Sequence, residues 1–520
     1  MTQTIDPRIL YSQSPFFLDY IEGKESATDF FQNSISSIRR LAEARKEIPN
    51  EQTRSDVCDA LLKYNRTLDA PSGTLANIER LRSSTTLCVI GGQQAGFLGG
   101  PLFVIHKIAS IIRTASWLSA HLDIAVVPIF WLASEDHDFD EINNTRWLDD
   151  SGALRTIAFD WDERGRPIEH LPISESVRDA FSEACQKISF ANPTDAAIFT
   201  PAEDDSYCTW HARMWSRLFA DSGLIIVEPR VLRPAAKPLF VQALIEAAEV
   251  EAALAQSASL LEAQGYTAPL DPATSGRLFH FDSNGVRQRI HDFSDAVHAL
   301  DSIEFSADAA LRPILADSLL PSIANILGPS ELAYHAMLRP LYERWEIPQP
   351  LAVPRHGATL ITEAGFNLLA DLGIEISDAL RPEFKPADLA KRLASEELTS
   401  RFSDAHERLE EALMPLRDHL SLLDPGLETR WRQTVDQARH QVDRLEERAI
   451  RAELARRGIS VKKVQNLKPL LRPMDKPQER ILSAFSFIAK YGVEWVHEMI
   501  AHGEPDRFEH QLVVLKELND

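Results

Sequence analysis

The sequence predicts an α/β protein: a doubly wound parallel-sheet core, plus an antiparallel helical hairpin of coiled-coil type. Two observations predict the sheet. Short apolar runs alternate with helical patterns, and five of these runs end in polar loops, near residues 90, 132, 227, 327 and 353. A third observation predicts the coiled coil: two long amphipathic segments, dense in charged residues, follow residue 386.

The stretch from Thr86 to Asn144 is the most informative part of the chain. An apolar run at 87–90 leads into a glycine-rich loop, a helical segment, and a second apolar run at 124–132 that ends in acidic residues. Strand, loop, helix and strand form the βαβ unit of a parallel sheet. Ligands bind such sheets just beyond the carboxyl ends of the strands, so we expect the functional residues to lie there.

A chain of 520 residues is too long for one hydrophobic core, so we expect several domains. Hairpins are predicted around residues 151 and 284, single helices over 235–264 and 332–344, and a kink at Pro415 in the first coiled-coil helix. The coiled coil has few apolar residues and is expected to pack on a partner chain. The predicted domains are a helical lead-in over 1–85, the core over 86–385 with insertions at about 145–222 and 265–310, the coiled-coil domain over 386–475, and C-terminal helices returning to the core over 476–520.

The composition excludes several classes of protein. A net charge of −22 argues against a general nucleic-acid binder, because contact with phosphates needs a basic surface. The four cysteines are scattered with no CxxC pair, which disfavours a disulfide framework and a cysteine-rich zinc site. The N-terminus lacks the features of a signal peptide, and no apolar run approaches the roughly 20 residues of a membrane span. A cytoplasmic location is expected.

The glycine-rich loop GGQQAGFLGGP is the first candidate binding site. Glycines let a backbone approach a ligand closely, and the following helix would direct free N–H groups at an anion. His106 and Lys107 lie one turn further along. The loop is neither a Walker A motif nor a GxGxxG fingerprint, and a turn that only packs the helix on the strand is the alternative. The candidate binding residues are Gly91, Gly92, Gln93, Gln94, Gly96, Gly99, Gly100 and Pro101, the last expected in the first turn of the helix.

The acidic segment SEDHDFDEINN is the second candidate, with five carboxylates in residues 135–141. Such carboxylates repel one another unless they bind a cation, an ammonium group or sugar hydroxyls. They could hold Mg²⁺ beside nucleotide phosphates, or bind a substrate amine and act as its general base. The alternative is a helix N-terminus rich in acid. The candidate catalytic residues are Glu135, Asp136 and Asp138, and the candidate binding residues are His137, Asp140, Glu141 and Asn143.

The third candidate set lies at the ends of the last two predicted strands. Gly328 and Glu331 open a helix that also carries Tyr334, and Arg355 follows the final strand. A helix N-terminus and an arginine fork both suit an anion. Each residue alone could have a purely structural role. As a set they favour a binding site, because they follow neighbouring strands.

The chain resembles the cysteine ligase family of bacillithiol biosynthesis. The resemblance rests on GGQQAGFLGGPLFVIHKI, PIFWLASEDHDFDEINN, the long segment FSADAALRPILADSLLPSIANILGPSELAYHAMLRPLYERW followed by LAVPR, and ERILSAFSFIAKYG. It implies a Rossmann-like parallel-sheet core with connecting-peptide insertions, an α-helical antiparallel coiled-coil domain and a homodimer. It also implies a reaction that joins L-cysteine to glucosaminyl-malate through an amide bond. The family core is similar to nucleotidyl-transfer ligases that activate a carboxylate as an acyl-adenylate, and a second nucleotide pocket near the coiled coil is associated with the family.

The sequence departs from related adenylating enzymes in two ways. It has no HxGH or KMSKS signature, and it has no cluster of Cys and His that could hold a substrate thiol on zinc, so no zinc is expected.

Three functional hypotheses follow. The first is an ATP-dependent ligase, with an ATP- or ADP-type nucleotide and Mg²⁺ as candidate cofactors. The second is an amide-forming or amidase-like enzyme that uses no nucleotide, and the third is a non-catalytic dimeric nucleotide-binding scaffold. In the first hypothesis the glycine loop cradles phosphates, Glu135, Asp136 and Asp138 bind and deprotonate the amine, Asp140 and Glu141 support them or hold metal, and the developing charge is neutralised by His106, Lys107 and Arg355.

Overall fold

The computed structural model describes residues 3–161, 165–290, 304–501 and 504–516. The chain folds into two compact units. Unit 1 comprises Met1–Trp147, Leu154–Leu360 and Lys476–Asp520, and unit 2 comprises Leu148–Ala153 and Ile361–Asp475. In the described part of the chain, no helix is both long enough and apolar enough to cross a membrane.

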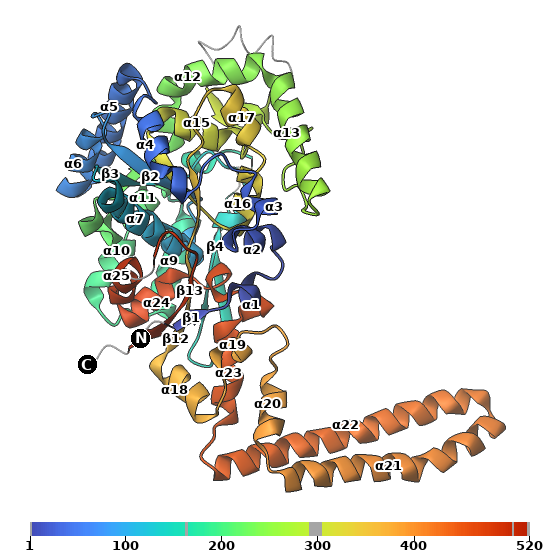
Figure 1. The fold of residues 1–520 in the computed structure, drawn as a ribbon. Helices are drawn as coiled ribbons and strands as arrows, with labels where there is room; N and C mark the ends of the chain where they lie inside the picture. Colours follow the sequence, from blue (N-terminus) through green and yellow to red (C-terminus); the bar gives the residue numbers. More distant parts are fainter. Residues whose placement is uncertain (1–2, 162–164, 291–303, 502–503, 517–520) are drawn as a thin grey trace. The chain divides into compact units, whose positions relative to one another are not determined.

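A five-stranded parallel sheet forms the centre of unit 1, in the order β11-β10-β2-β3-β6 (Figure 1). The strand that comes first in the chain, β2, lies in the middle, and later strands are added on both sides of it. Strand order therefore reverses between β2 and β10, which is the topological switch point where Rossmann-like sheets bind ligands. The predicted α/β class is confirmed. The strands are β2 (Leu87–Gln93), β3 (Val126–Leu132), β6 (Ile225–Val227), β10 (Ser322–Leu327) and β11 (Leu351–Pro354).

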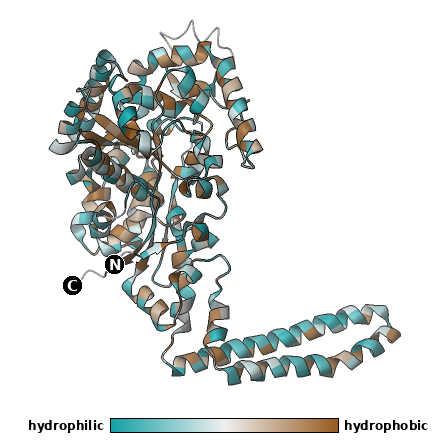
Figure 2. Cartoon of the chain, viewed as in Figure 1, coloured by the Kyte–Doolittle hydropathy of each residue, from teal (hydrophilic) through white to brown (hydrophobic). Residues whose placement is uncertain are grey.

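Helices cover this sheet. The helix α7 (Phe103–Leu122) packs on β2 and β3 and contacts α25 (Glu494–Ala501), and helices of the N-terminal segment contact β2, β6 and β10. Brown, apolar residues gather on the sheet and on the inner sides of these helices (Figure 2). The prediction of a mostly helical segment over 1–85 is confirmed. Its helices are α1 (Pro7–Tyr11), α2 (Pro15–Ile21), α3 (Glu25–Thr28), α4 (Ile38–Lys46), α5 (Glu51–Thr67) and α6 (Ser72–Arg80).

Both predicted hairpins are present. The strands β4 (Asn144–Leu148) and β5 (Leu154–Ala158) pair, and β7 (Leu278–Phe281) pairs with β8 (Arg287–Arg289) and β9 (Phe305–Ala307). Gly285 has φ +74° in the second turn, which explains the glycine there. Between β5 and β6 lie η3 (Ile168–His170), α9 (Glu175–Lys187), α10 (Pro193–Phe199) and α11 (Tyr207–Leu218).

Two helices predicted as single are each divided. The stretch 235–264 belongs to α12 (Pro229–Ile245) and α13 (Ala247–Ala263), which meet at Glu246. The stretch 332–344 belongs to α16 (Pro329–His335) and α17 (Arg339–Arg344), and α15 (Leu311–Leu319) precedes β10. Pro340 lies in the first turn of α17, where its missing N–H is tolerated, and it disfavours continuation of the preceding helix.

The C-terminal segment is helical only in part. After α24 (Ala484–Tyr491) and α25, residues 510–515 form a strand, so the prediction of helices throughout this segment is wrong there. That strand, β13 (His510–Leu515), lies between β1 (Gln3–Ile5) and β12 (Gly357–Thr362) in a small sheet. Leu512 and Val513 are buried, and this alternation-free apolar run is typical of a buried strand.

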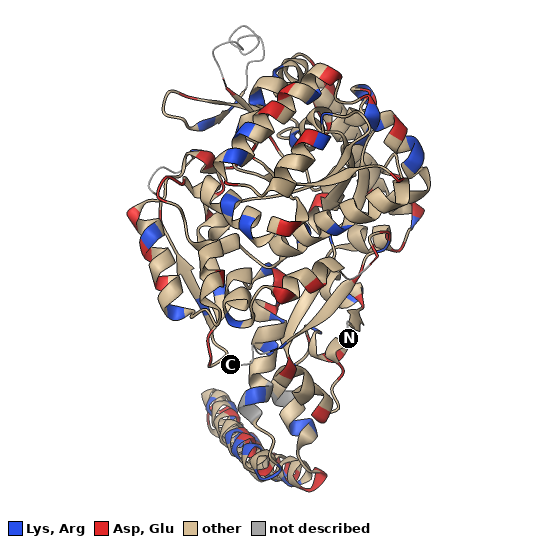
Figure 3. Ribbon diagram, turned by 90° about the vertical axis from the view of Figure 1, so that its left-hand side faces the viewer, with Lys and Arg blue, Asp and Glu red and all other residues tan. Residues whose placement is uncertain are grey.

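Unit 2 contains the predicted antiparallel helical pair, α21 (Glu396–Leu423) and α22 (Pro425–Arg456). Asp424 accepts a 2.7 Å hydrogen bond from Gly426 N and caps α22, and α21 continues through Pro415 rather than ending there. The pair is mostly hydrophilic and carries both signs of charge along its length (Figures 2 and 3). Leu416 and Leu423, placed on the predicted heptad, are 50% and 66% exposed. The other helices of the unit are α18 (Glu363–Asp371), α19 (Ile376–Ala379), α20 (Pro386–Leu393) and α23 (Val461–Leu471).

Candidate active site

The predicted site residues gather at one edge of the central sheet. The carboxyl ends of β2, β3, β10 and β11 are Gln93, Leu132, Leu327 and Pro354, and parallel pairing places these ends side by side. The segments that follow them include the candidate loops at 94–101, 134–141, 328–334 and 355. The candidate residues predicted from the sequence therefore lie at one edge of the sheet, while several individual side chains lie differently from expectation.

Gly91 and Gly92 belong to β2 rather than to the loop that was predicted to contain them. They pair with Phe130 and Trp131 of β3. A Cβ atom on Gly91 would lie 2.9 Å from Ile111 Cδ1 and 3.2 Å from Ile326 O, and one on Gly92 would lie 3.1 Å from Trp131 O. These two glycines thus allow close packing of α7 and β3 against the strand, which is the structural alternative stated for the motif.

The loop after β2 is folded tightly on itself. A Cβ atom on Gly96 would lie 2.7 Å from Gly100 Cα, and Gly99 and Gly100 have φ of +88° and +66°. The amide of Gly100 donates to Phe97 O at 3.1 Å, and Gly96 N donates to Gln94 O at 3.0 Å. These N–H groups are used within the loop, so they do not form the open anion cradle that was expected.

Pro101 precedes α7 rather than forming its first turn. The helix begins at Phe103, Pro101 bridges to Ser483, and Leu102 N donates to Leu482 O at 2.8 Å. The chain preceding α24 thus covers this entrance to the helix. The prediction of Pro101 in the first turn is wrong because the segment is fixed by this contact.

Lys107 forms a buried ion pair across the switch point. Its Nζ lies 2.7 Å from both carboxylate oxygens of Glu331 and donates to Gly92 O at 2.6 Å and Gln93 Oε1 at 3.0 Å. Burial lowers the pKa of Lys107, against the opposing charge of Glu331. All three donor directions of the ammonium are satisfied, so its role is to join β2 to α16.

His106 and Arg355 lie in a second buried cluster, centred on Glu479. Arg355 Nη1 and Nη2 donate to the two oxygens of Glu479 at 2.9 and 2.8 Å, and His106 Nδ1 lies 2.9 Å from Glu479 Oε2. Tyr11 Oη donates to Glu479 Oε1 at 2.9 Å. Burial acts to raise the pKa of Glu479, but the charge and hydrogen bonds of Arg355 hold it well below its ordinary value. Arg355 is 3% exposed, so its fork binds Glu479 and is closed to a substrate anion.

Gly328 and Glu331 form a helix cap. Gly328 N donates to Glu331 Oε2 at 2.6 Å, and α16 begins at the next residue. Burial acts to raise the pKa of Glu331, but Lys107 and this bond hold it below its ordinary value. Tyr334 is half-buried, with its pKa raised by burial and by Glu331, and burial lowers the pKa of the neighbouring His335 to about 4. Gly328, Glu331, Tyr334 and His335 therefore fill one side of the switch point.

The acidic segment divides into a buried and an exposed part. Glu135 is 2% exposed, Asp136 is half-buried, and His137, Asp138, Asp140 and Glu141 are exposed. Asp138 precedes the short helix α8 (Phe139–Ile142), and Asn143 follows it, half-buried. The carboxylates of this segment lie in different surroundings. Glu135 is bound by Arg233, whereas burial and the neighbouring charges of Asp138 and Asp136 raise the pKa of Glu141.

Asp136 is the carboxylate that faces cationic and amide groups of the crevice. Gln94 Nε2 donates to its Oδ2 at 2.9 Å. Burial acts to raise the pKa of Asp136, but the charge of Arg312, the bond from Gln94 and the charge of Arg287 keep it below its ordinary value. Asp136 is therefore ionised at neutral pH. Arg312 Nε has no hydrogen-bond partner among the described residues. Arg355 Nε has none there either, but both Nη atoms of Arg355 bind Glu479, so Arg312 is the guanidinium better placed to bind an anion.

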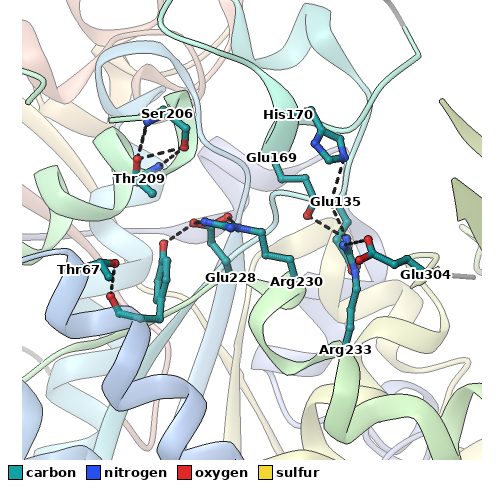
Figure 4. A network of polar contacts seen from close by, with 11 residues as sticks. Thr67, Glu135, Glu169, His170, Ser206, Thr209, Glu228, Arg230, Arg233 and Glu304 are labelled. Carbon is teal, nitrogen blue, oxygen red and sulfur yellow. Dashed lines mark hydrogen bonds and ion pairs between the residues drawn. The ribbon is translucent and has the colours of Figure 1, made fainter. Parts of the chain in front are cut away.

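An arginine that the sequence analysis did not select organises the other end of this segment (Figure 4). Arg233, on α12 just after β6, lies 3.2 Å from Glu135 Oε1 and 2.7 Å from Glu169 Oε1. Glu304 Oε2 lies 3.2 Å from its Nη1, and Phe281 presents its ring to the guanidinium at 4.8 Å. The end of β6 at Val227 was a visible signal for Arg233. Glu169 lies in an insertion far from any predicted strand end, and nothing in its sequence context marks it.

Two family models cover nearly all of the chain. The N-terminal Rossmann-like domain of bacillithiol biosynthesis BshC matches residues 4–356, and its C-terminal coiled-coil domain matches residues 358–515. The chain belongs to the BshC family. This result confirms both the family resemblance and the Rossmann-like and coiled-coil composition inferred from the sequence.

Relatives within the BshC family are similar over almost their whole length. The protein named "Putative cysteine ligase BshC" of Geobacillus thermodenitrificans is 29% identical, over 96% of this chain and 97% of its own length. The protein of the same name from Koribacter versatilis is 30% identical, over 93% of this chain and 94% of its own. The relatives are named as ligases, so the family is one of enzymes.

Proposed function

We propose that the protein is a ligase that joins the carboxyl group of L-cysteine to the amine of glucosaminyl-malate, with ATP-dependent activation of the carboxylate. Membership of the BshC family supports the reaction. One structural observation supports the placement of the chemistry: an ionised, half-buried Asp136 lies at the carboxyl edge of the sheet within the influence of Arg312. A carboxylate and a guanidinium at one edge suit an amine and an anion respectively.

Asp136 supplies the basic group in this proposal. It binds the substrate ammonium, and as general base it accepts a proton, so that the nitrogen lone pair can attack the activated carbonyl carbon. The C–N bond forms, and the bond between that carbon and the leaving oxygen breaks. Gln94 fixes the carboxylate by its 2.9 Å hydrogen bond. The exposed Asp140 and Glu141 are the carboxylates accessible to a hydrated Mg²⁺.

Arg312 supplies the anion contact. Its Nε is buried and lacks a partner within the described residues, which fits an anionic group such as a phosphate or a substrate carboxylate. When bound, an ATP-type nucleotide would supply the group that activates the cysteine carboxylate. Lys107, His106 and Arg355 are engaged by Glu331 and Glu479, so in this proposal they hold the frame of the crevice and do not touch the nucleotide.

The test uses the purified protein with ATP, L-cysteine and glucosaminyl-malate, and follows the thiol product together with AMP, pyrophosphate, ADP and phosphate. We expect product formation, and a loss of about 10²–10⁴ in kcat/KM for Asp136→Asn. Asp179→Asn, at an exposed position of α9, is the matched control for charge removal. Absence of product with every nucleotide would overturn the ligase proposal.

A second candidate is an amide-forming or amidase-like enzyme that uses no nucleotide. The observation that favours it is the internal pairing of Lys107, Arg355 and the loop amides, which leaves few groups for a triphosphate. Thermal unfolding with nucleotide separates the two. A nucleotide present at 100 times its dissociation constant adds about 2.7 kcal/mol of stability, and the absence of any shift favours the second candidate.

The helical pair is proposed to form a homodimer interface, as the family resemblance implies. The observation that supports it is the exposure of Leu416, Leu422 and Leu423 at 50%, 85% and 66%. The double change Leu409→Glu with Leu416→Glu should give monomers in light scattering. Ala405→Glu, at an exposed position, should leave the dimer intact. A dimer that survives the double change would place the interface elsewhere. Two results together would support the scaffold hypothesis. The first is loss of nucleotide binding in these monomers and in no other variant. The second is thiol production that survives the double change Glu135→Ala with Asp136→Ala.

A further inference from the structure

Two buried carboxylates share one guanidinium beside the proposed amine site (Figure 4). Glu169 binds Arg233 Nη2 with both oxygens, at 2.7 and 2.9 Å, and Glu135 Oε1 lies 3.2 Å from Arg233 Nε and Nη2. The side chains of Glu169 and Glu135 are 1% and 3% exposed. Both carboxylates contact the same nitrogen, so they lie close to each other in a region of low dielectric.

In the described part of the chain, the same guanidinium hydrogen-bonds both carboxylates of this pair. Arg230, which could have been a second cation for the pair, binds Glu228 at 2.8 and 3.2 Å, and Tyr64 also donates to Glu228. Glu304 reaches Arg233 from solvent and is 72% exposed. Arg233, Glu135, Glu228, Cys208 and His170 face Glu169. Glu304 shares Arg233, Arg166 and Arg230 act on His170, and Arg287 acts on Glu135. Within the described residues Arg233 is the guanidinium that hydrogen-bonds both Glu169 and Glu135, so these two carboxylates have one bound cation between them, and a single proton removes the second negative charge.

Histidine does not supply the missing positive charge. His170 Nε2 lies 3.6 Å from Glu169 Oε1. Burial and the positive charges of Arg166 and Arg233 lower the pKa of His170, so its ring is neutral at pH 7. Burial, together with the charges of Glu135 and Glu228, raises the pKa of Glu169 to about 7 against the opposing effect of Arg233. The geometry of the pair and the raised pKa of Glu169 thus agree that Glu169 carries a proton near neutrality.

Backbone pairing connects Glu169 to the acidic turn. Glu169 N donates to Ser134 O and Ile168 N donates to Asp136 O, each at 2.9 Å. The η3 turn therefore runs alongside residues 134–136 and holds both ends of the Glu135 peptide. A change of charge on Glu169 acts on Asp136 in two ways: through the electrostatic field of the Glu169 carboxylate and through these two backbone hydrogen bonds.

We propose that Glu169 is a positioning residue that shares one proton with Glu135 on Arg233, and that release of this proton strengthens the binding of an ammonium group at Asp136. The ligand class is a primary amine in its charged form, and in this respect the inference rests on the proposed function. The coupling is reciprocal, so binding of the ammonium group releases the shared proton. We expect a coupling of about tenfold in affinity.

The shared proton is tested first in the full-length protein without substrate. Infrared difference spectra between about pH 5.5 and about pH 8.5 should show the loss of a protonated carboxyl band with a midpoint near pH 7. The band should be absent in Glu169→Gln and present in Glu304→Gln, which removes the solvent-exposed carboxylate from the same arginine. If the spectra of the wild type and of Glu169→Gln show the same carboxyl change, the shared proton is overturned.

The coupling is tested by calorimetric titration with glucosaminyl-malate across the same range of pH. The amine titrates by itself, but this effect is common to all variants, so the ratio of affinities between wild type and Glu169→Gln isolates the pair. We expect this ratio to rise about tenfold from pH 6 to pH 8.5, with proton release detected in buffers of different ionisation enthalpy. Glu304→Gln should follow the wild type, and Glu169→Asp should restore the dependence in part. A ratio that does not change with pH overturns the coupling.

The two proposals fail in distinguishable ways. If no thiol product forms but the amine still binds with the expected pH dependence, the ligase reaction fails and this inference stands. If product forms and the ratio of affinities between wild type and Glu169→Gln does not change with pH, the ligase proposal stands and this inference fails. If the amine does not bind at all, the coupling is overturned, and the infrared band still decides whether the proton is shared. Circular dichroism of each variant shows that its fold is intact.

Discussion

The two sides of the crevice solve the same electrostatic problem differently. On the β10 side, one ammonium, Lys107, meets one carboxylate, Glu331, at 2.7 Å. On the β6 side, one guanidinium, Arg233, serves two buried carboxylates, Glu135 and Glu169. A balanced pair stays charged over a wide range of pH and fixes the structure, whereas an unbalanced set takes up a proton near neutrality. The comparison separates residues that hold the crevice from residues that can respond to what binds in it.

Breaking the balanced pair should have the largest effect on stability. Lys107→Ala leaves Glu331 and Gly92 O without their buried partner, and we expect a loss of about 3 kcal/mol in the free energy of unfolding, measured in urea. Lys187→Ala removes the exposed partner of Glu183 and should change stability by less than about 0.5 kcal/mol. Lys107→Met combined with Glu331→Leu should recover part of the loss. Equal effects of Lys107→Ala and Lys187→Ala would contradict a structural role for the pair.

Neutralising the unbalanced side should have a smaller effect that depends on pH. Folding raises the pKa of Glu169 from its ordinary value near 4.5 to about 7, so the folded protein binds the extra proton between these values. The contribution of Glu169 to stability is therefore fully present below pH 4.5 and is lost as pH rises through about 7. Relative to wild type, Glu169→Gln should gain on the order of 2–3 kcal/mol between about pH 4.5 and pH 8.

Denaturant unfolding at several pH values measures this difference, and Glu304→Gln is the matched control because it contacts the same arginine from solvent. A constant difference between wild type and Glu169→Gln would show that folding does not change the pKa of Glu169. That result would make the two sides of the crevice equivalent.

Crowding the glycine strand should have an intermediate effect that does not depend on pH. Gly91→Ala brings a Cβ atom within 2.9 Å of Ile111 Cδ1, so α7 must shift, and we expect a loss of about 1–2 kcal/mol in urea unfolding. Gly73→Ala is the control. Its Cβ would meet no atom closer than 3.8 Å, and in the helix α6 alanine should be neutral or stabilising by up to about 1 kcal/mol. If Gly91→Ala does not change the free energy of unfolding, the packing role is wrong and the predicted ligand-binding role of Gly91 is favoured again.

The smallest effect is expected in the exposed half of the acidic segment. Asp140→Asn changes a solvent-exposed side chain and should alter the free energy of unfolding by less than about 0.5 kcal/mol at any pH. The same thermal or urea unfolding measurement applies. A large effect would show that the exposed carboxylates act together with Glu135 rather than separately.

The fold was largely predictable because it depends on local patterns. The strand runs ending near 90, 132, 227, 327 and 353 all correspond to strands of one sheet, and Asp424–Gly426 correctly divides the helical pair. The errors concern places where distant contacts decide. Residues 510–515 pair with residues 3–5, and Pro101 bridges to Ser483, and no local pattern reveals either partner.

The sequence predicted that the candidate residues would gather at one edge of the sheet, and it predicted their side-chain pairing less well. Sequence spacing places Lys107, Arg355 and Asp136 near one another, but it does not show which are already paired. Arg355 is hydrogen-bonded by Glu479, which lies 124 positions away in the sequence, and Glu135 is hydrogen-bonded by Arg233, which lies 98 positions away. Only the three-dimensional contacts reveal that Arg312 lacks a partner in the described chain and that Glu169 has too many carboxylate neighbours.

The small sheet of β1, β13 and β12 has a consequence for synthesis on the ribosome. Gln3 pairs with Leu512, and Tyr11 lies 3.0 Å from His510 Nδ1, 499 positions along the chain. Until residue 515 has left the exit tunnel, β1 lacks the strand with which it pairs and Glu479 lacks its place beside Tyr11 and His106. The crevice thus reaches its final form only after translation of the helical pair, and the nascent core depends on protection from aggregation until then.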